Sequence, residues 1–265
     1  MFPHFHTDLT KEEKEILSSV QYASLIQKSL FPKERHFRRI SQDYGLIFLP
    51  HSILSGDFYW IGNKEEEHFI AVADCTGHGI PASLLSVMGI SLLNYIVFAK
   101  TFRECGNYLE ELDKKWIEGF QHEHNLPFNN DWMEISLLRI SKEQLEIASA
   151  RQKIILFNSF TSEIRVIKGD RYPIGGWQLE KNRRFKTICI DKNLYNEVYL
   201  LTDGLSDQFG GTLSKKLGMK PLIDIIRTPF GSVCEKIGFL EDYILNWKKN
   251  HTQTDDITMI GFALQ

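Results

Sequence analysis

An aspartate that closes a buried strand and opens a glycine-rich turn constrains this chain most. The strand is the apolar segment at residues 68–73, and an uncharged stretch at residues 79–99 follows the turn. A carboxylate in this position suits a metal ion better than it suits a core. Three more acidic turns lie along the chain, and the four runs are Ser55-Gly56-Asp57, Ala73-Asp74-Cys75-Thr76-Gly77-His78-Gly79, Thr202-Asp203-Gly204 and Thr254-Asp255-Asp256-Ile257.

Taken singly, each turn is weak evidence, because Asp beside Gly is ordinary turn chemistry. Taken together they say more, since three of the four adjoin strands that are apolar enough to be fully buried. Carboxylates gathered at the ends of core strands repel one another and raise one another's pKa. The same turns hold no matching set of Lys or Arg, so a bound cation is expected. Hard oxygen ligands suit Mg²⁺ or Mn²⁺, and the His and Cys spacing of a zinc site is absent.

Composition excludes several classes of protein. The 265 residues fit one large domain or two small ones, and 43% hydrophobic with 25% charged residues is typical of a soluble globular protein. A net charge of −3 argues against nucleic acid as a partner. The four cysteines form no CxxC pair, which favours a reducing compartment, and residues 1–9 do not form a signal peptide. We therefore expect a cytoplasmic protein.

The uncharged stretch at residues 79–99 is long enough to be taken for a transmembrane helix. Its polar content argues against that interpretation, because it includes a proline, two glycines, an asparagine and three serines. A helix packed on most of its circumference inside a large fold is the better interpretation, and no membrane partner is expected.

A helix is predicted at the start of the chain. The capping box Thr10-Lys11-Glu12-Glu13 opens it and Pro32 ends it. Between them, apolar residues recur at helical spacing: Ile16, Val20, Ala23, Ile26 or Gln27, and Leu30. This amphipathic face packs either on its own domain or on a partner or second copy, and the pattern does not decide between the two.

The rest of the chain predicts an α+β domain, because strands and helices occur in separate blocks. Helices are expected at residues 81–100, 104–122, 217–227 and 231–249. Strands are expected at residues 45–49, 57–62, 68–73, 134–140, 145–150, 153–158, 163–168, 185–190, 197–202 and 257–264, with those from 134 to 168 at the spacing of an antiparallel meander.

Carboxylate-bound metals fit one hydrolytic chemistry well. Two hard cations lower the pKa of a shared water, whose hydroxide attacks phosphorus without a Ser, Cys or His nucleophile. The chain contains no G-x-S-x-G, no P-loop and no G-x-G-x-x-G, which agrees with that chemistry and weakens nucleotide-binding interpretations.

These motifs resemble the bacterial SpoIIE-type serine/threonine phosphatases, a branch of the metal-dependent (PPM, type 2C) protein phosphatases. The resemblance runs from about residue 22 to the C-terminus, with the motifs in order. They are the four acidic turns above, with the first extended by Phe58-Tyr59-Trp60 and the third running to Gly211, together with Asp131-Trp132-Met133-Glu134-Ile135, Ala148-Ser149-Ala150-Arg151 and Tyr172-Pro173-Ile174-Gly175-Gly176.

The resemblance implies a four-layer α-β-β-α sandwich of two antiparallel sheets, with two Mn²⁺ or Mg²⁺ ions at one edge. It implies that Asp57, Asp74, Asp203 and Asp255 are the catalytic metal ligands, with Asp74 bridging the ions. The backbone carbonyl of Cys75 would be a further ligand. Asp256 stands where relatives often have Asn, so we expect it in the metal site behind the ligands.

Some positions depart from the family pattern. Trp60 stands where many relatives have a second Asp, so no ligand is expected there, and Cys75 stands where many have Gly. The arginine that grips substrate phosphate in animal and plant relatives has no counterpart near Asp57. His78 is expected to be a turn residue bonded to backbone rather than a proton donor, and residues 206–208 are expected to shape the loop beside the metals.

The predicted organisation is an N-terminal linker or regulatory helix at residues 1–32 and a phosphatase domain at residues 33–265. The predicted function is metal-dependent hydrolysis of phosphoserine or phosphothreonine on a regulatory protein, which the resemblance suggests is an anti-sigma-factor antagonist. The helix would support a homodimer or receive a signal from an upstream sensor. The alternatives are a phosphoprotein-binding module with weak catalysis and a hydrolase of small phosphate esters.

Overall fold

Two antiparallel sheets lie face to face in the computed structural model, which describes residues 10–120, 131–142, 144–176, 183–228 and 231–264. Sheet A has the order β1 (Tyr44–Leu49), β13 (Ile257–Ala263), β10 (Glu197–Leu201), β6 (Lys153–Asn158) and β7 (Glu163–Lys168). Sheet B has the order β2 (Phe58–Lys64), β3 (Glu67–Cys75), β4 (Trp132–Ile140), β5 (Leu145–Ala150) and β9 (Ile188–Ile190), with β8 (Ile174–Gly175) beside β4.

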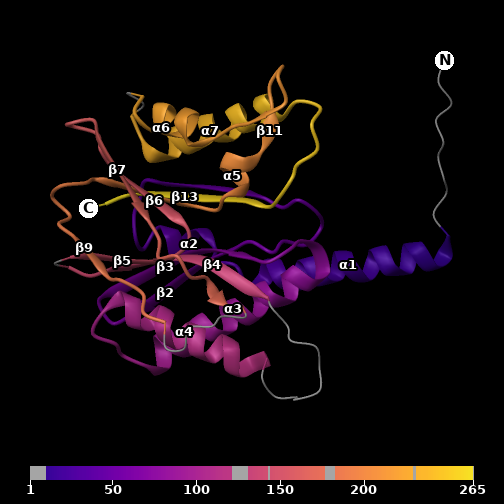
Figure 1. The fold of residues 1–265 in the computed structure, drawn as a ribbon, viewed down its shortest axis with the longest axis horizontal. Helices are drawn as coiled ribbons and strands as arrows, with labels where there is room; N and C mark the ends of the chain where they lie inside the picture. Colours follow the sequence, from indigo (N-terminus) through magenta and orange to yellow (C-terminus); the bar gives the residue numbers. More distant parts are fainter. Residues whose placement is uncertain (1–9, 121–130, 143, 177–182, 229–230, 265) are drawn as a thin grey trace.

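Helices cover the outer face of each sheet (Figure 1). Sheet B carries α3 (Gly79–Ala99) and α4 (Cys105–Phe120), and sheet A carries α6 (Met219–Ile226) and α7 (Val233–Lys248). This arrangement confirms the predicted four-layer α-β-β-α sandwich. Residues 121 and 122 of the helix predicted at residues 104–122 lie outside the described residues.

The core explains why β3 is apolar almost throughout. Its residues 69–73 are fully buried, because one face of the strand meets sheet A and the other meets the helices beneath sheet B. By length and composition α3 is capable of spanning a membrane, but half of its apolar window is buried inside the fold. The helix lies along sheet B, as predicted for a core helix (Figure 1).

The predicted continuous meander is wrong at one point. Strands β5 and β6 do not pair, because the chain crosses there from sheet B to sheet A. Arg151 turns the chain with a φ of 68°, and its N–H donates to the carbonyl of Asp170 at 2.9 Å. Strand spacing alone does not distinguish a hairpin within one sheet from a link between two facing sheets, so the sequence pattern missed this crossing.

The N-terminal helix α1 (Lys11–Leu30) begins with the predicted capping box, in which the side chains and backbones of Thr10 and Glu13 bond reciprocally. It projects beyond the sandwich and is followed by the short α2 (Glu34–Phe37) (Figure 1). Its buried side chains are Ser24 and Gln27, so the predicted stripe is buried at Gln27, while Ile16, Ile26 and Leu30 are exposed. The C-terminal end of the helix therefore docks on its own domain, while apolar side chains elsewhere on it stay exposed.

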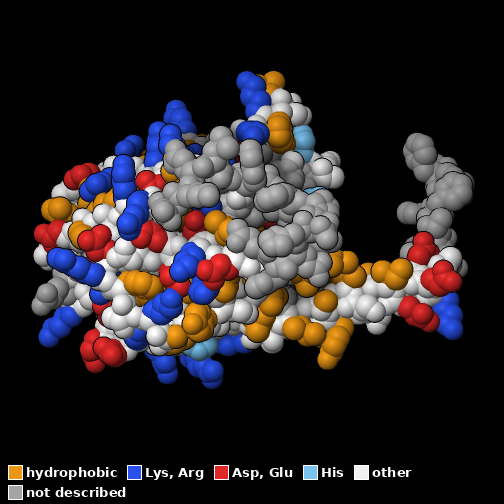
Figure 2. Space-filling view, turned by 60° about the horizontal axis from the view of Figure 1, so that its bottom comes forward, with side chains coloured by type: hydrophobic (Ala, Val, Ile, Leu, Met, Phe, Trp, Pro, Cys, Tyr) orange, Lys and Arg blue, Asp and Glu red, His pale blue; other side chains and the backbone are white. Residues whose placement is uncertain are grey.

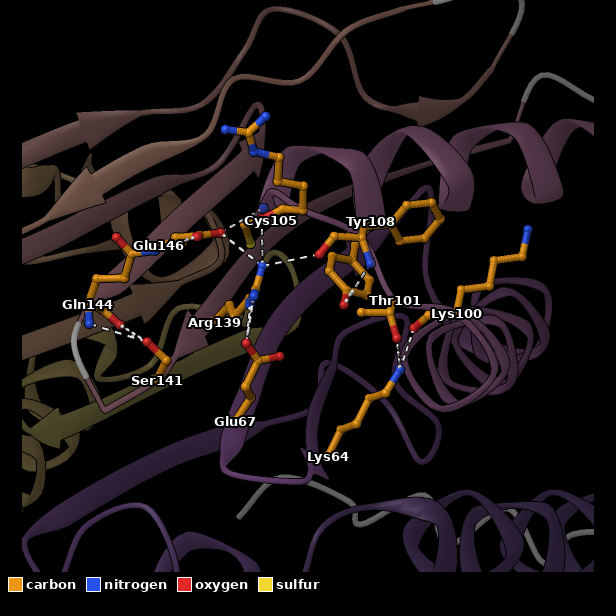
Figure 3. A network of polar contacts seen from close by, with 12 residues as sticks. Lys64, Glu67, Lys100, Thr101, Cys105, Tyr108, Arg139, Ser141, Gln144 and Glu146 are labelled. Atoms are coloured by element: carbon orange, nitrogen blue, oxygen red, sulfur yellow. Dashed lines mark hydrogen bonds and ion pairs between the residues drawn. The ribbon is translucent and has the colours of Figure 1, made fainter.

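A polar network at the far end of sheet B fastens the start of α4 (Figure 3). Arg139 donates to Glu67 Oε1 at 2.9 Å and to the carbonyl of Arg103 at 3.0 Å. The Cys105 N–H donates to Glu146 Oε2 at 2.8 Å, and Arg139 pairs with that same carboxylate. These bonds fix the α3–α4 connection at one end of sheet B. Asp74 and the acidic turns lie at the opposite end.

Candidate metal centre

The four acidic turns meet at one edge of the sandwich. Asp57 precedes β2 and lies next to Asp74, because Phe58 pairs with Ala73 in the antiparallel register. The Thr202 N–H donates to the Thr258 carbonyl at 2.9 Å, which brings the end of β10 beside the start of β13. The Thr202 hydroxyl also donates to Asp57 Oδ2 at 2.8 Å and so joins the two sheets.

Two glycines make this approach possible. A Cβ on Gly204 would lie 2.0 Å from the carbonyl oxygen of Asp256, so any side chain there would push the third and fourth turns apart. A Cβ on Gly56 would lie 3.2 Å from the carbonyl oxygen of Cys75. That carbonyl therefore faces the first turn, while the Cys75 thiol is buried and burial raises its pKa well above the usual value.

Asp57 provides the test of whether this edge fits a cation. Its side chain is 1% exposed, and its Oδ1 atom is buried without a hydrogen-bond partner among the described residues. Burial raises the pKa of Asp57 well above its usual value, and the charge of Asp256 raises it further. A buried carboxylate with an unpartnered oxygen requires a proton or a cation, so the residues fit a divalent metal.

Burial and neighbouring negative charge also raise the pKa values of the other carboxyl groups at this edge. Burial raises the pKa of Asp74 well above its usual value, and the charges of Asp57 and Asp203 add to the effect. Burial also raises the pKa of Asp203 and of Asp255. Asp57 is buried, Asp74 and Asp255 are half-buried and Asp203 is exposed, so the site opens to solvent on the Asp203 side.

Asp256 holds the loops of the site rather than pointing a free carboxylate into it. Its Oδ1 accepts from the His51 N–H at 2.6 Å and its Oδ2 accepts from the Gly56 N–H at 2.7 Å. This geometry supports the expected position behind the ligands. Within the described residues, no three His, Cys, Asp or Glu side chains form a cluster that would hold a metal ion alone. A metal ion at this edge would thus take backbone carbonyl or water ligands beside the carboxylates.

Comparison with known proteins identifies the fold and the family. The model of the family "Stage II sporulation protein E (SpoIIE)" matches residues 64–265. The chain belongs to the SpoIIE family. The SiaA-PP2C domain of Pseudomonas aeruginosa superposes with a TM-score of 0.83 at 25% identity, covering 97% of this chain and all of that one.

Two further proteins similar to this SpoIIE-family chain are bacterial phosphatases. The phosphoserine phosphatase RsbU of Bacillus subtilis (strain 168) is 34% identical over 87 residues, 31% of this chain and 24% of RsbU, so the match spans about a quarter of that curated relative. The PP2C phosphatase domain of Bacillus subtilis SpoIIE shares the fold, with a TM-score of 0.65 at 12% identity over 84% of this chain and 61% of that one. The predicted enzyme class, a protein-serine/threonine phosphatase, is confirmed.

One residue beside the acidic turns was not identified as functional from the sequence pattern. Gln27 in α1 is buried, and its Nε2 donates to the Ser55 carbonyl at 2.7 Å and to Ser86 Oγ at 2.9 Å. Its Oε1 accepts from the Ser55 N–H at 3.2 Å. The amide thus holds the turn that carries Asp57. Only the mixed apolar and polar stripe of the predicted helix could have signalled it, because the bonds span 28 residues or more.

The structure also shows the surroundings of three other positions that the sequence analysis named, His78, Trp60 and Asp207. His78 is exposed and makes no capping bond, and its ring centroid lies 4.7 Å from that of His51, so the expected backbone bond is not seen. Trp60 lies in the core, where its Nε1 donates to Asn94. Asp207 ends the short helix α5 (Gly204–Asp207), which follows Asp203, and pairs with Lys216 at 2.6 Å.

Proposed function

We propose that this chain removes phosphate from phosphoserine or phosphothreonine on a regulatory protein, with two Mn²⁺ or Mg²⁺ ions at the acidic edge. The ligands would be Asp57, Asp74, Asp203, Asp255 and the Cys75 carbonyl. The observation that carries the proposal is the unpartnered, buried Oδ1 of Asp57 among carboxyls whose pKa values are all raised.

Divalent cations at such a site lower the pKa of water and neutralise charge on phosphoryl oxygens. The chain's own residues supply the framework. Thr202 orients Asp57 by its hydroxyl bond, and Asp256 ties the 51–56 loop to the start of β13. The exposed Asp203 marks the side from which a phosphorylated segment enters.

The test is hydrolysis of p-nitrophenyl phosphate and of phosphoserine peptides with Mn²⁺, with Mg²⁺ and with EDTA. We expect turnover only with metal, and we expect saturating Mn²⁺ to raise the melting temperature because bound ligand stabilises the folded state. Turnover that persists in EDTA would contradict the proposal. Tight binding of a phosphoprotein without turnover at any metal concentration would instead favour the phosphoprotein-binding module.

We also propose a homodimer through α1, in the cytoplasm, with an upstream sensor domain or protein acting on the same helix. Figure 2 shows hydrophobic side chains along the arm that α1 forms. The exposed members are Ile16, Tyr22, Leu25, Ile26 and Leu30, with Ile26 51% exposed. Such a stripe on a projecting helix is typical of a helix–helix contact. The four cysteines are free, as expected in a reducing compartment.

Ile26→Asp should halve the mass in solution, because a charge in the stripe opposes burial against a second helix. Light scattering coupled to size-exclusion chromatography measures this. Ser18→Asp, on an exposed position of the same helix, is the matched control. A monomeric wild-type protein, or an unchanged mass for Ile26→Asp, would remove the dimer from the proposal.

A further inference from the structure

A basic pocket lies beside the acidic edge and has no part in the site described above. It encloses about 470 Å³ and is lined by Arg151, Lys153, Lys168, Gly169, Asp170 and Arg171. Four of these six residues are cationic, and none of them is one of the proposed metal ligands. A pocket of this charge is suited to an anion.

The pocket adjoins the open side of the metal centre. Arg151 Nε pairs with Glu134 Oε1 at 2.9 Å, and Glu134 stands directly opposite Asp74 in the register of β3 and β4. A group bound in the pocket would therefore sit next to a phosphorylated residue that enters past Asp203.

Two lysines in the pocket oppose each other. Lys153 in β6 pairs directly with Lys168 in β7 in the antiparallel register, and both are exposed. Side chains so placed have Cβ atoms about 5 Å apart, and like charges directly opposite destabilise a strand pair. An anion held between the two ammonium groups would offset that repulsion.

The backbone around the lysines is rigid. Arg151 is held by its left-handed turn and lies over the Trp132 ring, with its guanidinium carbon 5.5 Å from the ring centroid. The Gly169 N–H donates to the Gln152 carbonyl at 2.9 Å, and a Cβ on Gly169 would lie 2.6 Å from Ser149 Oγ. The one acidic side chain of the lining, Asp170, accepts from the Lys186 N–H at 2.7 Å through Oδ2. The sheet crossing thus builds the pocket before any ligand arrives.

We propose that this pocket binds a second anionic group of the phosphoprotein substrate, either a carboxylate or another phosphate next to the residue that is dephosphorylated. The inference rests on the proposed phosphatase activity and adds a preference for acidic sequence around the phosphorylation site. It also supplies a cationic contact with substrate, although the sequence offers no phosphate-gripping arginine near Asp57.

The experiment compares phosphoserine peptides of one sequence, flanked by Gln, by Glu or by a second phosphoserine. Wild-type protein should show kcat/KM about fivefold higher for the anionic flanks, the size expected of exposed ion pairs. The Glu and phosphoserine arms show which anion the pocket takes. In Lys153→Ala/Lys168→Ala the ratio of anionic to neutral flanks should fall to about one. Lys142→Ala, in the turn at the far end of β4, should keep the wild-type ratio.

A charge exchange separates recognition from a structural role. Lys153→Glu/Lys168→Glu should reverse the preference in favour of a Lys-flanked peptide, which a loss of structure would not produce. If the wild type turned over all peptides with equal kcat/KM, the proposed anion binding in the pocket would be wrong and the proposed phosphatase activity would stand. Turnover of none would count against the phosphatase, and binding of the same peptides to wild type and the double alanine variant would then decide the pocket separately.

Discussion

Asp74→Asn should reduce kcat for a phosphoserine peptide by about a thousandfold at saturating Mn²⁺, the size of effect seen when a main electrostatic contact of a transition state is removed. Asp74 lies next to Asp57 in the register of β2 and β3, and the charges of Asp57, Asp203 and Asp255 all raise its pKa. Steady-state kinetics measures the loss. Asp224→Asn, exposed on α6 outside sheet A, is the control that should retain activity.

The same variant should not lose stability without metal. The folded-state pKa of Asp74 is raised, so the folded protein holds a proton that the unfolded chain releases, and the free energy of unfolding falls as pH rises from the unfolded value of about 3.8 through the raised one. Asn removes that dependence. In EDTA, the free energy of unfolding of Asp74→Asn should therefore exceed that of wild type by more at pH 8 than at pH 5. Urea titrations measure this difference. Activity near the wild-type level, or a metal-free variant less stable than wild type at pH 8, would contradict this role for Asp74.

Lys236→Ala should lower the free energy of unfolding by about 3–5 kcal/mol, because it leaves a buried carboxylate without its partner. Lys236 in α7 is 1% exposed, and its Nζ donates to Glu197 Oε1 at 2.7 Å and to Oε2 at 2.8 Å. The ammonium also lies 4.5 Å from the Phe157 ring centroid. The pair joins α7 to sheet A and takes no part in the metal centre.

Urea unfolding followed by circular dichroism measures the change. The double variant Lys236→Met/Glu197→Gln removes both charges and nearly keeps the volume, so it should recover most of the lost stability. A loss below about 1 kcal/mol for Lys236→Ala would show that the pair contributes no more than an exposed one.

The acidic turns were predictable because they depend on local chemistry, and the sandwich was predicted from the family resemblance that those turns carry. Asp203 before Gly204 and Asp74 at the end of an apolar strand are signals within a few residues, and the capping box at Thr10 is likewise local. The sheet crossing at Arg151 was not predictable, because it depends on which strand each edge meets in space. The role of Gln27 was missed for the same reason, since its partners lie 28 residues away or further.

The bonds between Gln27 and Ser55 have a practical consequence for anyone who trims this protein. A chain that begins at residue 33 would lose the Gln27 amide, which bonds to the Ser55 carbonyl and N–H and lies between the first acidic loop and Ser86. The helix projects from the sandwich, yet its Gln27 holds the turn that carries Asp57 at the acidic edge. Truncation libraries should therefore start before Thr10.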